Sequence, residues 1–178
     1  MITKIRLQNW KSFKDSTIYI DSLGILIGTN ASGKSNVLDA FAFLRAVGEG
    51  KSLLDAIQTV RGGEDWIIRR GEDSFCIEIE IEIEGSSYLL DLRVIKRNSV
   101  FSFGPCEIRR LGIEDDDAVP GEFIDSARNI TWKTYDVPIL LDFWAKIYAT
   151  FRNIIILDPA PAKMRDYCKI SKELKSDG

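Results

Sequence analysis

The spacing of apolar and polar positions over residues 1–63 predicts a hairpin, a buried strand and two helices. Strand patterns, either alternating or continuously apolar, occupy residues 2–7, 17–20 and 24–28. Apolar positions recur at helical spacing over residues 33–47 and 51–60, before Gly62 and Gly63. The run at 24–28 reads GILIG, so we expect a buried strand that leads through a glycine-bearing loop into the first helix.

Residues 64–112 have the pattern of an antiparallel β-meander. Residues 75–84 alternate strictly, with isoleucine on one face and glutamate on the other. Further strand-like runs occupy residues 87–97, 100–103 and 106–111. Short polar or glycine-containing turns separate these runs, as hairpins require, so we expect an antiparallel β-subdomain in this part of the chain.

Residues 113–178 predict a loop, a helix, a strand and a polar tail. The loop is acidic at residues 114–117, and Asp136 with Pro138 indicates a helix start. The helix would carry a thick apolar stripe formed by Leu140, Phe143, Trp144, Ile147, Tyr148 and Phe151. Residues 153–157 (NIIIL) are typical of a buried strand, and the lysine-rich tail that begins at residue 162 is consistent with a helix.

Composition excludes several kinds of chemistry. The 178 residues include 24 Lys+Arg and 27 Asp+Glu, so the net charge is 24 − 27 = −3, and there is no histidine. Without histidine the chain cannot form a Ser-His-Asp or Cys-His catalytic centre or a histidine-ligated zinc site. The cysteines at positions 76, 106 and 168 form no CxxC pair, which favours reduced thiols.

No apolar stretch is long enough to cross a bilayer, so we expect a soluble cytoplasmic protein without membrane contact. A slightly acidic balance gives no support for DNA binding by charge alone.

One motif carries recognisable chemistry. Residues 28–35 (GTNASGKS) fit the P-loop pattern G-x-x-x-x-G-K-[ST], between a predicted strand and a predicted helix. Gly28 and Gly33 permit a tight loop whose backbone N–H groups, between Asn30 and Ser35, can point at phosphate oxygens. The motif therefore predicts a site for ATP with Mg²⁺, in which Lys34 would be the catalytic charge on the β- and γ-phosphates. The hydroxyl of Ser35 would ligate the metal.

Residues 5–15 and 25–40, which flank and include this motif, resemble the N-terminal segment of ABC-type AAA ATPase heads of the SMC/RecF/OLD-like group. Asn30 and Asn36 separate this group from nucleotide kinases and small GTPases, whereas Ala31 stands where many relatives carry glycine. The resemblance places nucleotide between Lys11-Ser12 and the P-loop. The full set of residues expected to bind nucleotide is Lys11, Ser12, Gly28, Asn30, Ala31, Ser32, Gly33, Lys34, Ser35 and Asn36.

The resemblance also implies a fold, partners and a setting. The fold would be the α/β N-terminal lobe of a P-loop NTPase, with a mixed sheet and an antiparallel β-meander. In such heads ATP is hydrolysed between two head-to-tail copies, which implies a homodimer or higher oligomer. DNA repair or anti-phage defence would be the pathway, with an effector nuclease or toxin as a possible partner, and DNA contact is left open.

Several parts of such an ATPase have no counterpart in this sequence. They are the signature segment, a Walker B aspartate followed by a catalytic glutamate, and a switch histidine. Residues 153–158 imitate Walker B, but Pro159 occupies the place of the glutamate, so Asp158 is either a magnesium ligand or a structural carboxylate at a strand end. We therefore expect residues 1–178 to be the N-terminal part of one head, truncated at the C-terminus, with ATP hydrolysis a property of the complete protein.

Two other functions stay open, and the remaining features have ordinary explanations. The chain could be a non-catalytic nucleotide-sensing or assembly module, or a P-loop kinase, although a kinase would need an acceptor site and an arginine-bearing lid. The glutamate row of residues 78–84 favours a solvated strand face, offset by basic residues on the next strand, over a cation site. We expect the acidic loop at 114–117 to be solvated, and Trp144 to lie in the core. Two arginine pairs, at 69–70 and 109–110, are weak evidence for contact with DNA phosphates.

Overall fold

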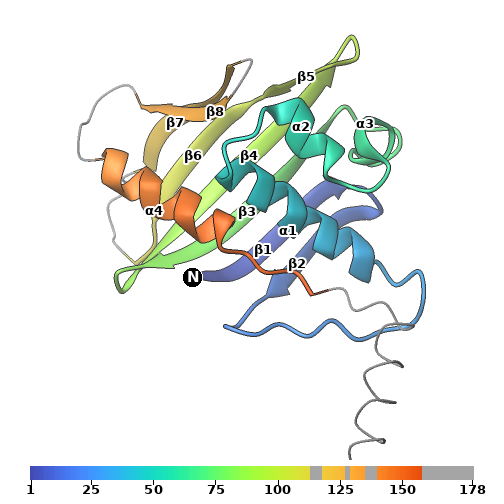
Figure 1. Ribbon diagram of the computed structural model, residues 1–178, viewed down its shortest axis with the longest axis horizontal. Coiled ribbons are helices and arrows are strands. Elements are labelled where there is room, and N and C mark those ends of the chain that lie inside the picture. The colour runs from blue at the N-terminus through green and yellow to red at the C-terminus, as the bar shows by residue number, and fades with distance from the viewer. Residues whose placement is uncertain (113–117, 127–128, 135–139, 158–178) are drawn as a thin grey trace, which may run out of the picture.

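An antiparallel sheet of eight strands forms the body of the protein (Figure 1). The computed structural model describes residues 1–112, 118–126, 129–134 and 140–157. The strand order is β2-β1-β3-β4-β6-β7-β8, and β5 pairs with β4 beside this path. The strands are β1 (Ile2–Trp10), β2 (Phe13–Tyr19), β3 (Ser74–Ile83), β4 (Ser86–Arg97), β5 (Val100–Phe103), β6 (Pro105–Arg110), β7 (Ala118–Ser126) and β8 (Asn129–Thr134).

The N-terminal hairpin and the meander belong to one continuous sheet. β1 pairs with β2 on one side and with β3 on the other, so that Ile5 lies opposite Ile79 and Leu7 opposite Ile77. The sequence assigns these strands to two separate stretches, 1–63 and 64–112. Non-local pairing between β1 and β3 joins the two stretches into one sheet.

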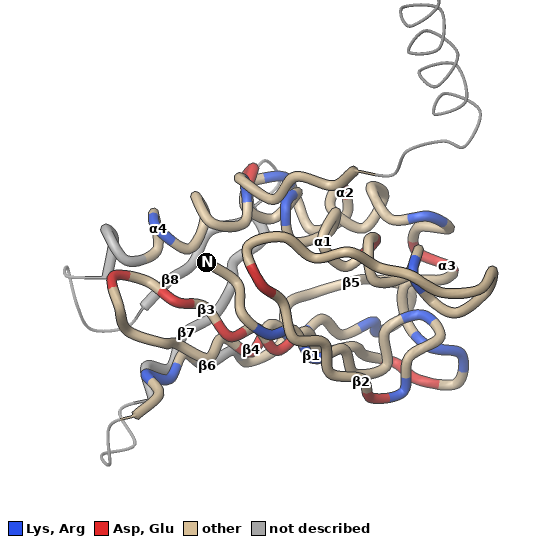
Figure 2. The backbone as a smooth tube through the Cα atoms, turned by 90° about the horizontal axis from the view of Figure 1, so that it is seen from below, with Lys and Arg blue, Asp and Glu red and all other residues tan. Residues whose placement is uncertain are grey.

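The four helices within the described residues lie on one face of this sheet, as Figures 1 and 2 show from two directions. They are α1 (Lys34–Gly48), α2 (Leu53–Gln58), α3 (Gly63–Trp66) and α4 (Leu140–Arg152). The covered face holds the core, in which the rings of Trp10, Phe43 and Phe75 meet one another with centroids 5.0–5.8 Å apart. Burial of this apolar layer is the main force that holds α1 against the sheet. Trp144 is also buried, as expected for a core residue.

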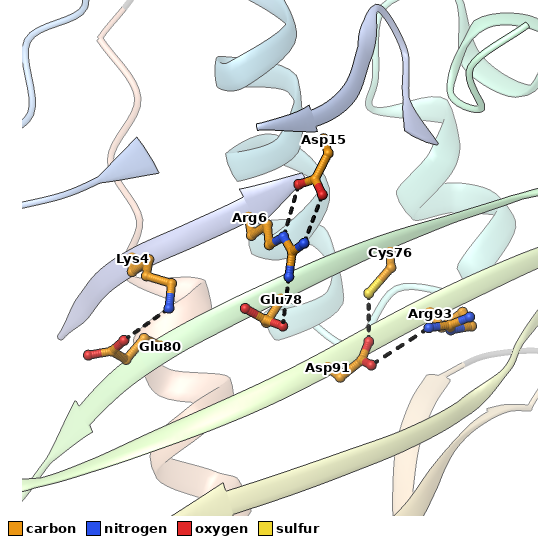
Figure 3. A network of polar contacts seen from close by, with 8 residues as sticks. All are labelled: Lys4, Arg6, Asp15, Cys76, Glu78, Glu80, Asp91 and Arg93. Carbon is orange, nitrogen blue, oxygen red and sulfur yellow. Dashed lines mark hydrogen bonds and ion pairs between the residues drawn. The ribbon is translucent and has the colours of Figure 1, made fainter. Parts of the chain in front are cut away.

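β3 follows its predicted alternation, and the other face of the sheet carries charge. Ile77, Ile79 and Ile81 are fully buried, whereas the glutamates point to the uncovered face. Their cationic partners come from β1 rather than from β4: Lys4 lies 3.5 Å from Glu80, and Arg6 lies 3.9 Å from Glu78 (Figure 3). The sequence predicts that basic residues of β4 offset these glutamates, and this prediction is wrong for Glu78 and Glu80. The register instead places cations of β1 directly opposite the two carboxylates.

Arg93 of β4 instead belongs to a small cluster around Cys76. The Cys76 thiol donates a hydrogen bond to a carboxylate oxygen of Asp91, with 2.6 Å between sulfur and oxygen, and Arg93 lies 3.9 Å from the other oxygen (Figure 3). Burial raises the pKa of the Cys76 thiol far above its ordinary value, and the hydrogen bond and negative charge of Asp91 raise it further. This thiol is an inert core group rather than a nucleophile.

The raised pKa of Cys76 has a consequence for stability. The unfolded thiol, with a pKa of about 8.5, releases its proton as the pH rises, whereas the folded thiol keeps it. This contribution to the free energy of unfolding is therefore complete below about pH 8.5. It declines above that pH by up to about 1.4 kcal/mol per pH unit. Urea unfolding between pH 7 and 10 should show a steeper loss in wild type than in Cys76→Ala. If the unfolding free energy fell equally steeply with pH in wild type and in Cys76→Ala, the pKa of the folded thiol would not be raised.

α1 and α4 pack closely where α1 ends. A methyl group added at Gly48 would lie 2.6 Å from the Arg152 nitrogen and 2.6 Å from Cβ of Phe151, and 2.9 Å from the Tyr148 carbonyl oxygen. Two of these atoms belong to the backbone of α4, which cannot move without shifting the helix. The contact explains why the chain has glycine at this crossing.

We therefore expect Gly48→Ala to lower the free energy of unfolding by about 1–3 kcal/mol, because the helices must separate. Gly24→Ala is the matched control, since its added methyl group would meet only Ile20, at 3.9 Å. Chemical denaturation of both variants measures the difference. A Gly48→Ala protein as stable as the control would show that the helix crossing relaxes freely.

Four expectations from the sequence need correction. Residues 24–28 and 153–157, predicted as buried strands, have no strand structure and expose apolar side chains. Ile27 is 91% exposed, and Ile155 and Leu157 are 82% and 78% exposed. The described strands all pair antiparallel, so the parallel pairs that a mixed sheet requires do not occur among them. Conversely, the sequence predicts no strand between residues 113 and 134, where β7 and β8 lie, because Pro120 and Gly121 weaken the strand pattern there.

The remaining helix and loop predictions have mixed outcomes. The first helix matches within a residue, and the second is shorter than predicted, with a further short helix, α3, beginning at Gly63. The acidic loop at 114–117, Asp136 and Pro138, Asp158 with Pro159, and the lysine-rich tail all lie outside the described residues.

Candidate nucleotide site

The P-loop segment has the backbone geometry that its glycines predict. Gly33, which precedes α1, has a φ of 91°, in the left-handed region that favours glycine, and a Cβ there would lie 2.8 Å from the Phe13 ring. Gly28 lies close to the far side of the loop, since a Cβ on it would lie 2.8 Å from the Ser32 hydroxyl oxygen, which would have to rotate away. Both glycines thus permit a loop that folds tightly onto itself and enters α1.

Lys34 holds this loop together from inside. Its ammonium donates hydrogen bonds to the carbonyl oxygens of Gly28 and Thr29, each at 2.6 Å, and to the Ser32 hydroxyl at 3.3 Å. These acceptors keep the positive charge within the curve of the loop. The arrangement is suited to a phosphate, because a phosphate oxygen in the curve would meet both the ammonium and the N-terminal end of α1.

Ala31 adopts a backbone conformation that alanine disfavours. Its φ is 65°, and a residue with a Cβ in this left-handed region costs about 1–2 kcal/mol relative to an ordinary conformation. This finding sharpens the sequence observation that many relatives carry glycine at this position.

We expect Ala31→Gly to raise the free energy of unfolding by up to about 1 kcal/mol, because glycine removes this conformational strain. Ala42→Gly, within α1, is the opposite control and should lower stability by about 1 kcal/mol. Thermal melting of the two variants beside wild type measures both effects. A lower melting temperature for Ala31→Gly would show that the loop does not need glycine there.

The turn between β1 and β2 is fastened to the first turn of α1. The Asn36 side-chain amide donates to the Ser12 hydroxyl at 2.7 Å, and the Trp10 indole donates to the Asn36 carbonyl at 2.8 Å. Ser12 and Asn36, both expected to bind nucleotide, are therefore brought together, whereas the P-loop residues Asn30, Ala31 and Ser32 lie exposed on the loop. Their roles as nucleotide ligands stay predictions.

A charged cluster lies next to the loop, and sequence reasoning missed two of its members. The Asp39 carboxylate, which is 4% exposed, accepts a hydrogen bond from the Lys11 ammonium and another from Arg61 Nε at 3.0 Å. Arg61 also donates through Nη2 to the Ser35 carbonyl at 3.1 Å, and Lys11 donates to the Arg61 carbonyl at 2.8 Å. Lys11, expected to contact nucleotide, is thus engaged in this cluster. Asp39 could have been found from its place four residues after Ser35, on the same side of α1.

The residues present fit a magnesium ion only in part. The Ser35 hydroxyl is exposed in the first turn of α1, where a metal between protein and phosphates would need a ligand. Among the described residues no group of three or more acidic or cysteine side chains could hold a metal ion. Magnesium commonly binds through one or two protein oxygens, with water and substrate phosphates as its other ligands, so Ser35 suits an ion that arrives with its nucleotide.

Comparison with known proteins gives this geometry a family. The family model described as "AAA ATPase domain" matches residues 1–176, which is nearly the whole chain. The chain belongs to the AAA ATPase domain family. The α/β structure with its glycine-bounded loop before α1 is therefore a P-loop NTPase fold.

The relatives of this AAA ATPase domain are much longer proteins. It is 27% identical over 179 residues to "DNA double-strand break repair Rad50 ATPase" of Sulfolobus acidocaldarius, across 98% of this chain and 17% of that protein. It is 34% identical over 113 residues to a protein of the same description from Thermoplasma volcanium, across 63% of this chain and 11% of the relative. Over 53 residues it is 42% identical to "Chromosome partition protein Smc" of Methanococcus voltae, which covers 29% of this chain and 4% of the relative.

These findings confirm the resemblance to SMC-type, ABC-like ATPase heads. The domain spans less than a fifth of the length of the Rad50 relatives, so the activity of a whole relative does not transfer to it directly. Within the described residues, no helix is both long and apolar enough to span a membrane.

Proposed function

We propose that this chain binds Mg·ATP through residues 28–35, as the N-terminal part of an SMC/Rad50-like ATPase head. The loop geometry is the observation that carries the proposal. Gly33 turns the backbone into α1, and Lys34 holds its ammonium inside the loop. Lys34 would bind the β- and γ-phosphates and Ser35 the Mg²⁺ ion, while Ser12 and Asn36 lie at the side of the loop that faces the β1–β2 turn.

Arg61 adds a second cation at the phosphate end. Its side chain is half exposed and its guanidinium donates to the Ser35 carbonyl, so it lies beside the residue proposed to hold the metal. A guanidinium in this position can donate its remaining N–H groups to a phosphate oxygen. We propose that Arg61 contributes to polyphosphate binding together with Lys34.

The exposed apolar segments support the view that further chain completes the head. Leu23, Ile25 and Ile27 precede the P-loop, and Ile155 and Leu157 follow α4, with most of each side chain in solvent. Soluble proteins rarely leave such runs uncovered unless something packs on them. We propose that a C-terminal part of the ATPase packs on both segments and gives them the hydrogen-bonded neighbours that they lack among the described residues. That part would also supply the signature segment, the Walker B pair and the switch histidine, which this sequence does not contain.

In the complete protein, ATP binding would engage two heads head-to-tail, and hydrolysis would release them. A homodimer or higher oligomer in the cytoplasm is the corresponding assembly. Similarity to a DNA double-strand break repair ATPase and to a chromosome partition protein favours a role in DNA repair or chromosome partition. Anti-phage defence with an effector nuclease or toxin rests on family resemblance alone.

A binding assay combined with a turnover assay tests the proposal. Titration of the purified chain with Mg·ATP should give saturable binding, and phosphate release should be negligible because the catalytic glutamate is absent from this sequence. Robust turnover by the isolated chain would overturn the half-head proposal. Binding without turnover even after a C-terminal ATPase part is added would favour a non-catalytic nucleotide-sensing module.

A further inference from the structure

Asp39 is the one charged side chain, within the described residues, that lies in the core. It is on α1, four residues after Ser35, so its carboxylate is on the same side of the helix one turn further from the phosphate end. Burial of a carboxylate is unfavourable unless each oxygen has a strong partner. A residue of this kind at this place therefore needs an explanation beyond packing.

Each oxygen of Asp39 has a partner from a segment distant in sequence. Oδ2 accepts from the ammonium of Lys11, in the β1–β2 turn, and Oδ1 accepts from Nε of Arg61, which precedes α3. Lys11 also donates to the backbone carbonyl of Arg61. The three residues thus form a closed ring of hydrogen bonds that fixes both the backbone and the side chain of Arg61.

Only one end of Arg61 is held by this ring. Nε faces Asp39 inside the protein, whereas Nη2 reaches the carbonyl of Ser35 at the start of α1. The planar guanidinium is therefore held at two points, and its side chain is 53% exposed. An arginine that is fixed in this way loses little conformational entropy when it meets an anion.

We infer that Asp39 is a positioning residue for phosphate recognition, which holds the Arg61 guanidinium beside Ser35 without touching nucleotide itself. The inference deepens the proposed function and rests on it. It predicts that affinity for a polyphosphate depends on a buried carboxylate whose own charge repels phosphate. If Asp39 acted only through long-range charge, its neutralisation would instead strengthen binding.

A double-mutant cycle tests this inference. Arg61→Gln should weaken Mg·ATP binding about tenfold, and Asp39→Asn should weaken it by a similar factor because Arg61 is then released. The double variant should bind no more weakly than Arg61→Gln alone, since the two residues act through one contact. Binding of AMP, which has no β- or γ-phosphate, should change less than binding of ATP in every variant. Arg45→Gln, on the outer part of α1, is the control and should leave affinity unchanged.

The outcomes separate this inference from the proposed function. Additive losses, which would give about a hundredfold in the double variant, would mean that Asp39 acts independently of Arg61 and would overturn the inference. An unchanged affinity in Arg61→Gln would overturn it too, even if Asp39→Asn fails to fold. Equal losses for AMP and ATP would indicate a merely structural role. If wild type itself does not bind Mg·ATP, the proposed function fails and the inference fails with it.

Discussion

Lys34→Ala is expected to weaken Mg·ATP binding by about a hundredfold or more. The Lys34 ammonium is the charge closest to the centre of the P-loop, and a charge-assisted hydrogen bond to phosphate is about twice as strong as a neutral one. The alanine variant also leaves the Gly28 and Thr29 carbonyls without this donor, so the loop loses the group that holds it closed. Isothermal titration with Mg·ATP measures the difference directly.

A change in folding must be separated from a change in the site. The hydrogen bonds of Lys34 lie entirely within residues 28–34, so the melting temperature of Lys34→Ala should stay close to that of wild type. Lys14→Ala, on the exposed side of β2, removes the same charge from the surface and should leave affinity unchanged. Wild-type affinity in Lys34→Ala would remove the basis for placing phosphate in this loop. An equal loss in both variants would mean that only overall charge matters.

The sequence predicts those elements whose hydrophobic pattern is local. The alternation of β3 and the helical spacing of α1 each reflect one buried face, and the structure matches both. The P-loop is similar in kind, because the Lys34 ammonium binds the carbonyl oxygens of Gly28 and Thr29, which lie only a few residues before it. Contacts of this range are encoded by neighbouring residues, so a motif of eight positions is enough to identify them.

Pairing between distant segments is what the sequence does not predict. The hairpin at the N-terminus and the meander look like separate units, yet β1 and β3 are neighbours in one sheet. The same limit applies to the cluster around Asp39, whose partners Lys11 and Arg61 lie 28 and 22 residues away. No local pattern specifies that these three side chains meet.

The wrong strand predictions at residues 24–28 and 153–157 have a related physical cause. Their apolar composition is typical of buried segments, but a strand also needs a hydrogen-bonded neighbour on at least one side. Neither segment has one among the described residues, so both remain without strand structure and expose side chains such as Ile27 and Ile155. The sequence thus predicts that these segments favour burial, but not which segment pairs with them. The proposed C-terminal part of the head would provide that hydrogen-bonded neighbour.

Phe43→Ala is expected to produce the largest loss of stability, about 3–5 kcal/mol of unfolding free energy. Phe43 is fully buried on α1, and its ring lies 5.8 Å from that of Trp10 and 5.6 Å from that of Phe75. Its removal leaves a cavity between α1 and the sheet. Urea unfolding should show a lower midpoint. Leu54→Ala, on the exposed side of α2, is the control and should change stability by less than about 0.5 kcal/mol.

The same variant also connects the core to the nucleotide site. Trp10 packs on Phe43 and donates its indole hydrogen bond to the Asn36 carbonyl, so the cavity adjoins the side chain that holds the first turn of α1. If the P-loop binds Mg·ATP only when α1 is docked, nucleotide at a hundred times its dissociation constant adds about 2.7 kcal/mol of stability. Mg·ATP should then restore most of the stability that Phe43→Ala loses, and should not do so in a Lys34→Ala background. A Phe43→Ala protein that binds nucleotide tightly but gains no stability would show that the loop folds independently of the core.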